Sequence, residues 1–274
     1  MEHREALLAL RTFLSTQILG QEKLIERLLI ALLADGHMLV EGAPGLAKTK
    51  AIKELAEGIE AQFHRIQFTP DLLPADITGT EIYRPETGSF VFQQGPIFHN
   101  LVLADEINRA PAKVQSALLE AMAERQVSVG RSTYELSPLF LVMATQNPIE
   151  QEGTYPLPEA ELDRFMLKVR MDYPDVEQEL DMVRQVSRST RADMLDVQPL
   201  RTVLQAREVL ALQRIASDLP LDDQVLDYAV RLARTTRSWP GLTLGAGPRA
   251  SIALVRCARA RALLRGGEFV IPDD

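Results

Sequence analysis

Cysteine and histidine are scarce in this sequence of 274 residues, and each shortage excludes a kind of site. With Cys257 as the single cysteine, the chain can form neither an internal disulfide nor a thiolate metal cluster. Cys257 lies in an alanine-rich helical run, which favours a buried structural thiol over a reactive one. The four histidines lack ligand spacing such as H-E-x-x-H, so we expect no zinc site. They are His3, His37, His64 and His99.

Long apolar runs are also missing. No segment approaches the roughly 18 uninterrupted apolar residues of a membrane span, so we expect no membrane-spanning helix. The first residues, MEHREALLAL, contain acids and a helical pattern in place of the basic start and apolar core of a signal peptide, which predicts a cytoplasmic protein. Hydrophobic residues make up 46% of the chain and charged residues 25%, as in a globular protein with room for a large and a small domain.

Negative charge is missing from one long stretch. The net charge is −8, yet residues 228–267 contain eight arginines and no Asp or Glu, so the remaining residues carry −16. This asymmetry is typical of a surface for nucleic acid, an acidic neighbour or phosphate, and the alternative is a solvated face of alanine-rich helices. The overall acidity argues against a dedicated nucleic-acid binder, and we expect no nucleic-acid partner.

Apolar strands and amphipathic helices alternate up to about residue 171, which predicts a mostly parallel sheet covered by helices. Beyond that point the strand signals vanish, and periodic runs predict a smaller helical domain over 172–274. The chain stops at GEFVIPDD, where Pro272 and two aspartates are compatible with the start of another helix and hence with a C-terminal truncation. The expected strands are 37–42, 100–106 and 138–148; the expected helices are 21–36, 48–59, 111–126, 175–186, 224–237 and 248–264.

Two alternating segments between these elements predict β-hairpins. Residues 81–95, EIYRPETGSFVFQQG, have turn residues from Glu86 to Gly88. Residues 126–136, QVSVGRSTYEL, have a turn at Gly130 and Arg131. Such hairpins can touch a substrate or brace a neighbouring subunit, and the sequence favours neither.

The segment GAPGLAKTK resembles a phosphate-binding loop, G-x-x-x-x-G-K-[ST], except that Ala47 replaces the second glycine. It lies between an apolar strand and a helix, which is the context that such a loop needs. Its backbone N–H groups and the helix N-terminus would face phosphate oxygens, while Lys48 supplies positive charge and Thr49 a ligand for Mg²⁺. Gly42 and Gly45 belong to the parts that such a loop needs, and alanine at position 47 costs little if φ stays negative there.

Polar residues follow the next two expected strands. Asp105 and Glu106 end the run LVLADE, and ligands bind at this carboxyl edge in open parallel sheets. The first acid would hold the metal and the second would orient or activate water. An isolated acidic pair is usually a surface turn, but its coincidence with the loop favours an active site. Asn147 could present its amide to water or the γ-phosphate, although Asn-Pro is also an ordinary turn.

Four segments occur in an order that resembles a known family. They are GAPGLAKTK, LVLADEINRAP, ATQNPIEQEGTYPLPEAELDRF and GPRAS. Over essentially its whole length the chain resembles the MoxR family of AAA+ ATPases, in the helix-2-insert group, where alanine is the usual residue at the position of Ala47. The resemblance implies a P-loop NTPase αβα core over 1–171, an all-helical lid over 172–274, and ATP and Mg²⁺ as cofactors.

The same resemblance implies roles for individual residues. Asp105 with Thr49 would hold Mg²⁺, Glu106 would activate water, and Asn147 would be sensor 1. Arg164 would be an arginine finger that reaches the neighbouring subunit's γ-phosphate, whereas without the resemblance it is a surface arginine. Arg249 would be sensor 2 and contact phosphate in its own subunit. The implied nucleotide-binding residues are Gly20, Gln21, Gly42, Ala43, Pro44, Gly45, Leu46, Ala47, Lys48 and Thr49.

The function implied is ATP hydrolysis in a homo-oligomeric ring, expected to be a hexamer, coupled to chaperone-like remodelling, maturation or activation of protein complexes. The expected partners are a protein client and a protein with a von Willebrand A domain. One alternative is a magnesium-chelatase-like or nucleic-acid-associated motor subunit, for which DNA would stimulate hydrolysis. Another is an ATP-gated assembly scaffold with little turnover; Glu106, Asn147 and Arg164 argue against it, because binding alone requires none of them.

Overall fold

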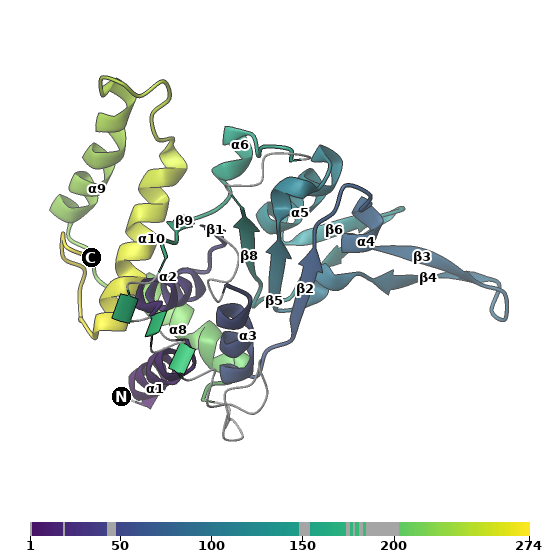
Figure 1. Ribbon diagram of the computed structural model, residues 1–274, viewed down its shortest axis with the longest axis horizontal. Helices are drawn as coiled ribbons and strands as arrows, with labels where there is room; N and C mark the ends of the chain where they lie inside the picture. Colours follow the sequence, from purple (N-terminus) through teal and green to yellow (C-terminus); the bar gives the residue numbers. More distant parts are fainter. Residues whose placement is uncertain are drawn as a thin grey trace.

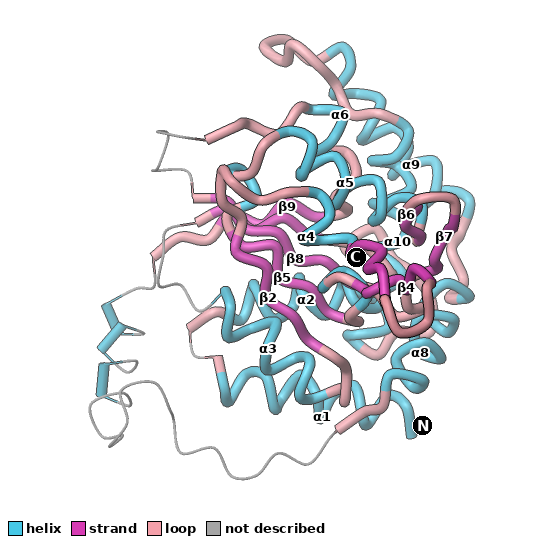
Figure 2. Tube along the Cα trace, turned by 90° about the vertical axis from the view of Figure 1, so that its right-hand side faces the viewer, coloured by secondary structure: helices cyan, strands magenta, loops and turns pink. Residues whose placement is uncertain are grey.

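The computed structural model describes residues 2–18, 20–42, 48–147, 154–173, 176–177, 179–180, 183–184 and 203–274. Its centre is a parallel sheet in the order β2-β5-β8-β1-β9 (Figures 1 and 2). Strands β5, β8 and β1 are central and almost entirely buried, so both faces of the sheet must be covered. The strand bounds are β1 Met38–Glu41, β2 Phe63–Gln67, β5 Leu101–Asp105, β8 Leu141–Gln146 and β9 Leu167–Arg170.

Alternate residues of the central strands enter two separate hydrophobic clusters, one on each face of the sheet. Leu101 and Leu103 of β5 belong to one cluster, whereas Val102 and Ala104 belong to the other. This follows from the two-residue period of a strand, which points successive side chains to opposite faces. The first face carries α1 Glu2–Gln17, α2 Glu22–Leu33 and α3 Lys48–Gly58; the second carries α4 Pro74–Thr78 and α5 Ala112–Glu124. The predicted αβα sandwich is confirmed.

Both expected hairpins are present. In the first, β3 Gly79–Arg84 pairs antiparallel with β4 Ser89–Gln94 and projects from the core (Figure 1). Gly79 has φ 93°, and a Cβ there would collide with the Gln93 carbonyl, so glycine lets the two strands leave the core together. In the second, β6 Gln126–Val129 pairs with β7 Ser132–Glu135 around the predicted turn at Gly130. The assignment of the first hairpin to a helix-2 insert stays a prediction.

The C-terminal part is helical, as expected, and comprises α8, α9 and α10. The C-terminal half of α10 is buried against α8, α2 and α1, whereas its N-terminal half stands outside the core beside α9 (Figure 1). Because α8 and α10 share a hydrophobic cluster with α1 and α2, the domain boundary at residues 171/172 stays a prediction. The helix bounds are α8 Ala206–Asp218, α9 Asp223–Thr235 and α10 Pro248–Arg265.

Short elements and connections complete the described fold. Half of the residues of the helix expected over 175–186 lie outside the described residues. Where the structure describes the chain, no helix combines the length and apolar character needed to cross a bilayer; the cytoplasmic location stays a prediction. The remaining elements are α6 Glu159–Leu162 and the 3-10 helices η1 Pro96–Phe98, η2 Ile107–Arg109 and η3 Thr236–Ser238.

The arginine-rich stretch mostly contacts its own chain. Arg231 pairs with Asp227 at 2.8 Å, and Arg259 donates to the Leu219 carbonyl at 3.1 Å. Hydrogen bonds or ion pairs within the chain are likewise made by Arg237, Arg249, Arg256, Arg261 and Arg265. Seven of the eight arginines thus have partners within the chain, which weighs against this stretch being a binding surface for nucleic acid.

Candidate nucleotide site

The expected phosphate and metal residues gather at one edge of the sheet. Strands β1, β5 and β8 run parallel and end at Glu41, Asp105 and Gln146. The register places Gln146 beside Glu41, and Gly42 continues this pairing by donating its N–H to the Gln146 carbonyl at 3.3 Å. Lys48 starts α3, and five residues of the intervening loop separate it from Gly42. The carboxyl edge therefore brings together the segments that the sequence singled out.

Lys48 points back across the phosphate-binding segment. Its Nζ donates to the Gly42 carbonyl oxygen at 2.7 Å. Burial lowers the pKa of Lys48, while the negative charges of Asp105 and Glu106 oppose that shift. The Lys48 ammonium therefore interacts electrostatically with both carboxylates. Thr49 follows in the first turn of α3. Ala43, Pro44, Gly45, Leu46 and Ala47, all expected to bind nucleotide, lie outside the described residues.

A buried threonine joins the two acidic residues. Thr145, in β8, donates its hydroxyl to Asp105 Oδ1 at 2.5 Å and accepts the backbone N–H of Glu106 at 2.9 Å. Glu106 takes a left-handed conformation, with φ 58°, which ends β5 and turns its side chain out of the strand. Because Thr145 is only 1% exposed, these bonds fix the backbone between the two carboxylates. No motif in the sequence marks Thr145.

Two further residues from β2 hold the carboxylates. Arg65 donates to Asp105 Oδ2 through Nη2 at 2.6 Å and Nε at 3.1 Å. Gln67 donates to Glu106 Oε2 at 3.0 Å, and Arg109 lies 3.3 Å from the same oxygen. Since no strand was expected over 63–67, these contacts were not predicted. Only the pairing of β2 with β5 makes Arg65 and Gln67 neighbours of the acids.

Three other expected residues are described by the structure, and one of them follows β8 directly. Asn147 directly follows β8 and is 9% exposed, so its amide lies next to the segment that carries Thr145. Gly20 and Gln21 precede α2; Gly20 has φ 69°, and Gln21 is the N-cap residue. Their contact with adenine stays a prediction.

The residues at the carboxyl edge fit Mg²⁺. No group of three metal-ligating His, Cys, Asp or Glu side chains occurs in the described part of the chain. Mg²⁺ bound with a nucleotide needs only one or two protein oxygens, because phosphates and water complete its octahedron. Asp105 supplies a carboxylate oriented by Thr145, and Thr49 supplies a hydroxyl at the start of α3. Both donors are hard oxygens of the kind that Mg²⁺ prefers.

Arg164 and Arg249 lie at the other edge of the sheet. Arg164 precedes β9 and donates to the Leu119 carbonyl of α5 at 2.9 Å. Arg249, in the first turn of α10, lies 3.9 Å from Asp163. Both arginines line a cavity of about 510 Å³ together with His37, which immediately precedes β1. The four residues of β1 alone separate this edge from the Lys48 edge by roughly 13 Å.

The position of Arg249 bears on its expected sensor 2 role, which stays a prediction. A sensor 2 contact with phosphate in the same subunit would require Arg249 at the carboxyl edge, next to Lys48. Instead α10 packs on α8 and α2 so that its first turn lies near Asp163 at the amino edge. The structure thus brings Arg249 together with Arg164, and not with Lys48 or Asp105. Their catalytic roles stay predictions.

The geometry defines a class of protein first: a P-loop NTPase fold, in which β1 and the start of α3 lie beside two carboxylates at the end of β5, followed by a helical lid. Comparisons with known proteins agree. A family model described as the ATPase family associated with various cellular activities (AAA) matches residues 37–167, and one described as the AAA lid domain matches residues 234–274.

Relatives along most of the chain identify the family. The chaperone MoxR1 of Mycobacterium tuberculosis is 46% identical, over 94% of this chain and 69% of its own. The uncharacterized protein YeaC of Bacillus subtilis is 50% identical, over 90% of this chain and 75% of its own. A crystal structure from Cytophaga hutchinsonii, assigned to the ATPases, has a TM-score of 0.89 and 43% identity, covering 99% of this chain and 83% of its own. The chain belongs to the MoxR family of AAA+ ATPases.

Proposed function

We propose that the protein binds ATP with Mg²⁺ at the carboxyl edge of its sheet and hydrolyses it within a ring of identical subunits. The observation that carries this proposal is the shared hydrogen bonding of Asp105 and Glu106 to Thr145, beside Lys48. A site that only bound nucleotide would have no need for a second, oriented carboxylate. Membership in an ATPase family and the similar solved structure support the proposal.

Each residue would contribute one physical effect. Lys48 and the backbone N–H groups of the preceding loop bind phosphate oxygens, and Thr49 and Asp105 hold the metal. Bound Mg²⁺ would neutralise charge on the transferring phosphoryl group. Glu106 accepts a proton from, or orients, the attacking water, and Asn147 donates an amide hydrogen bond on the same side. For this, Glu106 must turn away from Gln67 and Arg109, which hold it now.

The two arginines at the amino edge would serve a neighbouring subunit. Arg164 and Arg249 line a common cavity on the side of the sheet remote from Lys48. When a subunit presents its amino edge to the carboxyl edge of the next, both guanidinium groups can approach the neighbour's phosphates. A charge supplied in this way makes hydrolysis depend on assembly. We propose this trans role for both residues, with six subunits as the expected ring size.

The work performed is proposed to be remodelling of a protein client. A relative at 46% identity is named a chaperone, and the projecting hairpin and lid give the ring surfaces that could contact a client. We further propose a partner with a von Willebrand A domain and a role in the maturation or activation of protein complexes. A nucleic-acid-associated motor is the alternative, although most lid arginines are engaged within the chain.

Binding and turnover in two matched variants test this function. Lys48→Ala should abolish binding of a fluorescent ATP analogue, because the charge that faces the phosphates is removed. Glu106→Gln should retain binding and lose at least about a hundredfold in turnover, because the amide cannot take up a proton. Retained micromolar binding in Lys48→Ala, or unchanged turnover in Glu106→Gln, would contradict the proposal. Strong stimulation of wild-type turnover by DNA would favour the motor, and binding without turnover the scaffold.

A further inference from the structure

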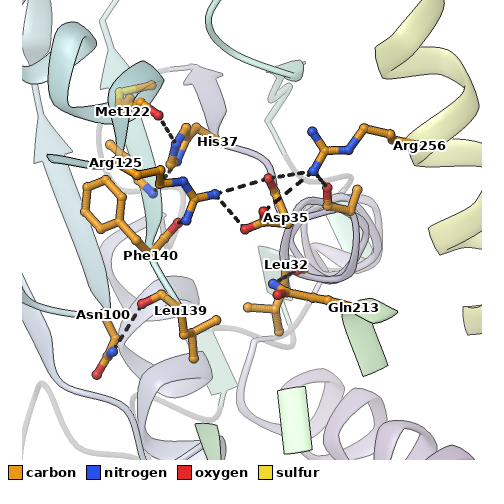
Figure 3. Close-up of polar contacts among 12 residues, drawn as sticks. Leu32, Asp35, His37, Asn100, Met122, Arg125, Leu139, Phe140, Gln213 and Arg256 are labelled. Carbon is orange, nitrogen blue, oxygen red and sulfur yellow. Dashed lines mark hydrogen bonds and ion pairs between the residues drawn. The ribbon is translucent and has the colours of Figure 1, made fainter. Parts of the chain in front are cut away.

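Asp35 is shared between an arginine of the core and an arginine of the lid (Figure 3). Arg125 Nη2 lies 2.6 Å from Asp35 Oδ1, and Arg256 Nη2 lies 3.8 Å from Asp35 Oδ2. Asp35 follows α2 in a left-handed conformation, with φ 50°, which ends the helix and presents the carboxylate. Arg125 ends α5, and Arg256 belongs to α10. One side chain thus connects three elements that are distant in sequence.

On the core side, several contacts hold Arg125 in place beside Asp35. Arg125 also has a left-handed conformation, with φ 56°, and its carbonyl accepts the Leu136 N–H at 2.9 Å, which closes the base of the β6–β7 hairpin. Its Nη1 donates to the Phe140 carbonyl at 3.3 Å, and its guanidinium carbon lies 5.9 Å from the Phe140 ring centroid. Phe140 immediately precedes β8. Arg125 therefore holds the start of the strand that carries Thr145 and leads to Asn147.

His37 also connects α5 to β8. Its Nδ1 accepts the Val142 N–H of β8 at 3.0 Å, so Nε2 carries the hydrogen and donates to the Met122 carbonyl of α5 at 3.3 Å. Burial of the ring, and next the charge of Arg125, lower the pKa of His37 to about 3, so the imidazole stays neutral. Arg125 and His37 therefore both connect the end of α5 to the start of β8, close to Asp35.

The contact on the lid side is looser. Arg256 donates to the carbonyls of Ala34 and Asp35, the latter at 3.0 Å, and thereby caps the negative end of α2. Its approach to the Asp35 carboxylate is longer than that of Arg125, and its side chain is 42% exposed. A half-exposed ion pair of this kind contributes little by itself and can separate at low cost.

Arg256 also sits where α10 changes from buried to exposed. On one side of it, Ala260 and Leu264 are 0% and 3% exposed; on the other, Ile252 is 59% exposed. Two cavities, of about 510 and 350 Å³, flank this level of the helix, and Asp35 and Arg256 are the two residues that line both. All residues of α10 before Arg256 are partly or fully exposed, so the outer half of the helix lacks the fully buried side chains that hold the inner half.

We propose that the Asp35–Arg256 contact is the pivot of the outer lid, and that Arg125 transmits the state of this pivot to β8. When α10 tilts, Arg256 would leave the carboxylate, and Asp35 would remain with Arg125 alone. A shift of Arg125 would then alter its hydrogen bond to the Phe140 carbonyl, directly before β8. The six residues of β8 carry that change over roughly 20 Å to the carboxyl edge. Asp35, Arg125 and Arg256 are thus positioning residues, and their effect on turnover rests on the function proposed above.

The test measures lid position directly. Spin labels at Ser238→Cys in the outer lid and Glu120→Cys in α5 occupy exposed positions, and double electron–electron resonance gives the distribution of distances between them. Native Cys257 should stay unlabelled, because burial raises the pKa of its thiol to about 11. The distribution is measured without nucleotide in the parent, Arg256→Gln, Asp35→Asn and the double variant. Arg259→Gln is the matched control: it removes an arginine one turn away whose recorded partner is the Leu219 carbonyl.

If the pivot is real, Arg256→Gln and Asp35→Asn each broaden the distribution by about twofold, the double variant broadens it no further, and Arg259→Gln does not. Turnover in unlabelled protein should fall about tenfold in Arg256→Gln while KM for ATP stays within about twofold, since the nucleotide contacts are intact. Equal distributions in Arg256→Gln and Arg259→Gln would overturn the pivot. Additive broadening in the double variant would do so too, because it would mean that the two residues act separately.

A different pattern is expected if the Asp35–Arg256 contact only stabilises the position of the lid and does not affect β8. Arg256→Gln would then broaden the distribution and lower the thermal midpoint, yet leave kcat unchanged, which would overturn the link to β8. Arg256→Lys, which keeps a charge near Asp35, should recover at least half of the lost turnover if transmission is electrostatic. If the wild-type protein does not turn over ATP, the proposed function fails, while the distances measured without nucleotide still decide whether the pivot exists.

Discussion

Replacing Thr145 by valine should destabilise the fold and disturb the acidic pair at once. The substitution keeps the size of a residue that is 1% exposed and removes its hydroxyl. A hydrogen bond to a charged carboxylate contributes about 1.5–3 kcal/mol, and leaving the Glu106 N–H without a partner costs about 1 kcal/mol more. Because Arg65 still holds Asp105, we expect the free energy of unfolding to fall by about 2–4 kcal/mol.

Thr145→Ser is the matched control, since it keeps the hydroxyl and loses only a buried methyl group, worth about 1 kcal/mol. Denaturant unfolding followed by circular dichroism measures both variants under the same conditions. A loss below about 1 kcal/mol in Thr145→Val, or equal losses in the two variants, would refute the view that the hydroxyl orients the acids. ATP turnover should follow the same order, with serine near the wild type and valine at least about tenfold slower.

Two other predictions use different properties of the chain. The pKa of His37 lies at about 3 in the fold and near 6.5 when unfolded, so the unfolded state binds the extra proton between these values. The free energy of unfolding should thus fall as the pH drops from 6.5 to 3, by at most about 1.4 kcal/mol per unit, and His37→Gln should flatten this part of the profile in equilibrium denaturation; parallel profiles would argue against it. Arg65→Gln should lower the Mg²⁺ concentration needed for half-maximal binding of an ATP analogue by about two- to fivefold, because the cation no longer competes with a guanidinium for Asp105. A higher requirement in a Mg²⁺ titration would show that Arg65 orients Asp105 for the metal.

The interior of the sandwich was predictable because its residues follow simple rules. Strands β5 and β8 are central, and apolar side chains on both faces make them visible as continuous runs. The hairpins were visible from their alternating residues and turn glycines. Strands β2 and β9 lie at the sheet edges and read FHRIQ and LKVR. Their charged, partly exposed residues show no strand pattern, so the pairing that gives them their place is tertiary.

The candidate site divides in the same way. Lys48, Asp105 and Asn147 were found because a local motif or a strand end marks each of them. Arg65 was not, since its relation to Asp105 depends on an edge strand. The place of Arg249 beside Asp163 was not predicted for a related reason: the order of residues along the chain does not specify the direction in which the helical C-terminal part packs. The loop from Ala43 to Ala47 lies outside the described residues, and its role stays a prediction.

The central claim, a catalytic site completed by a neighbouring subunit, is tested most directly by mixing two inactive variants. Glu106→Gln removes the activating carboxylate and keeps Arg164, whereas Arg164→Ala does the reverse. If Arg164 acts in trans, an equimolar mixture assembled together should regain about a quarter of wild-type turnover, the share of interfaces that unite an intact carboxylate with an intact arginine. Turnover that stays at the level of the separate variants would contradict the account, provided that light scattering shows intact assemblies and that an affinity tag on one variant co-purifies the other.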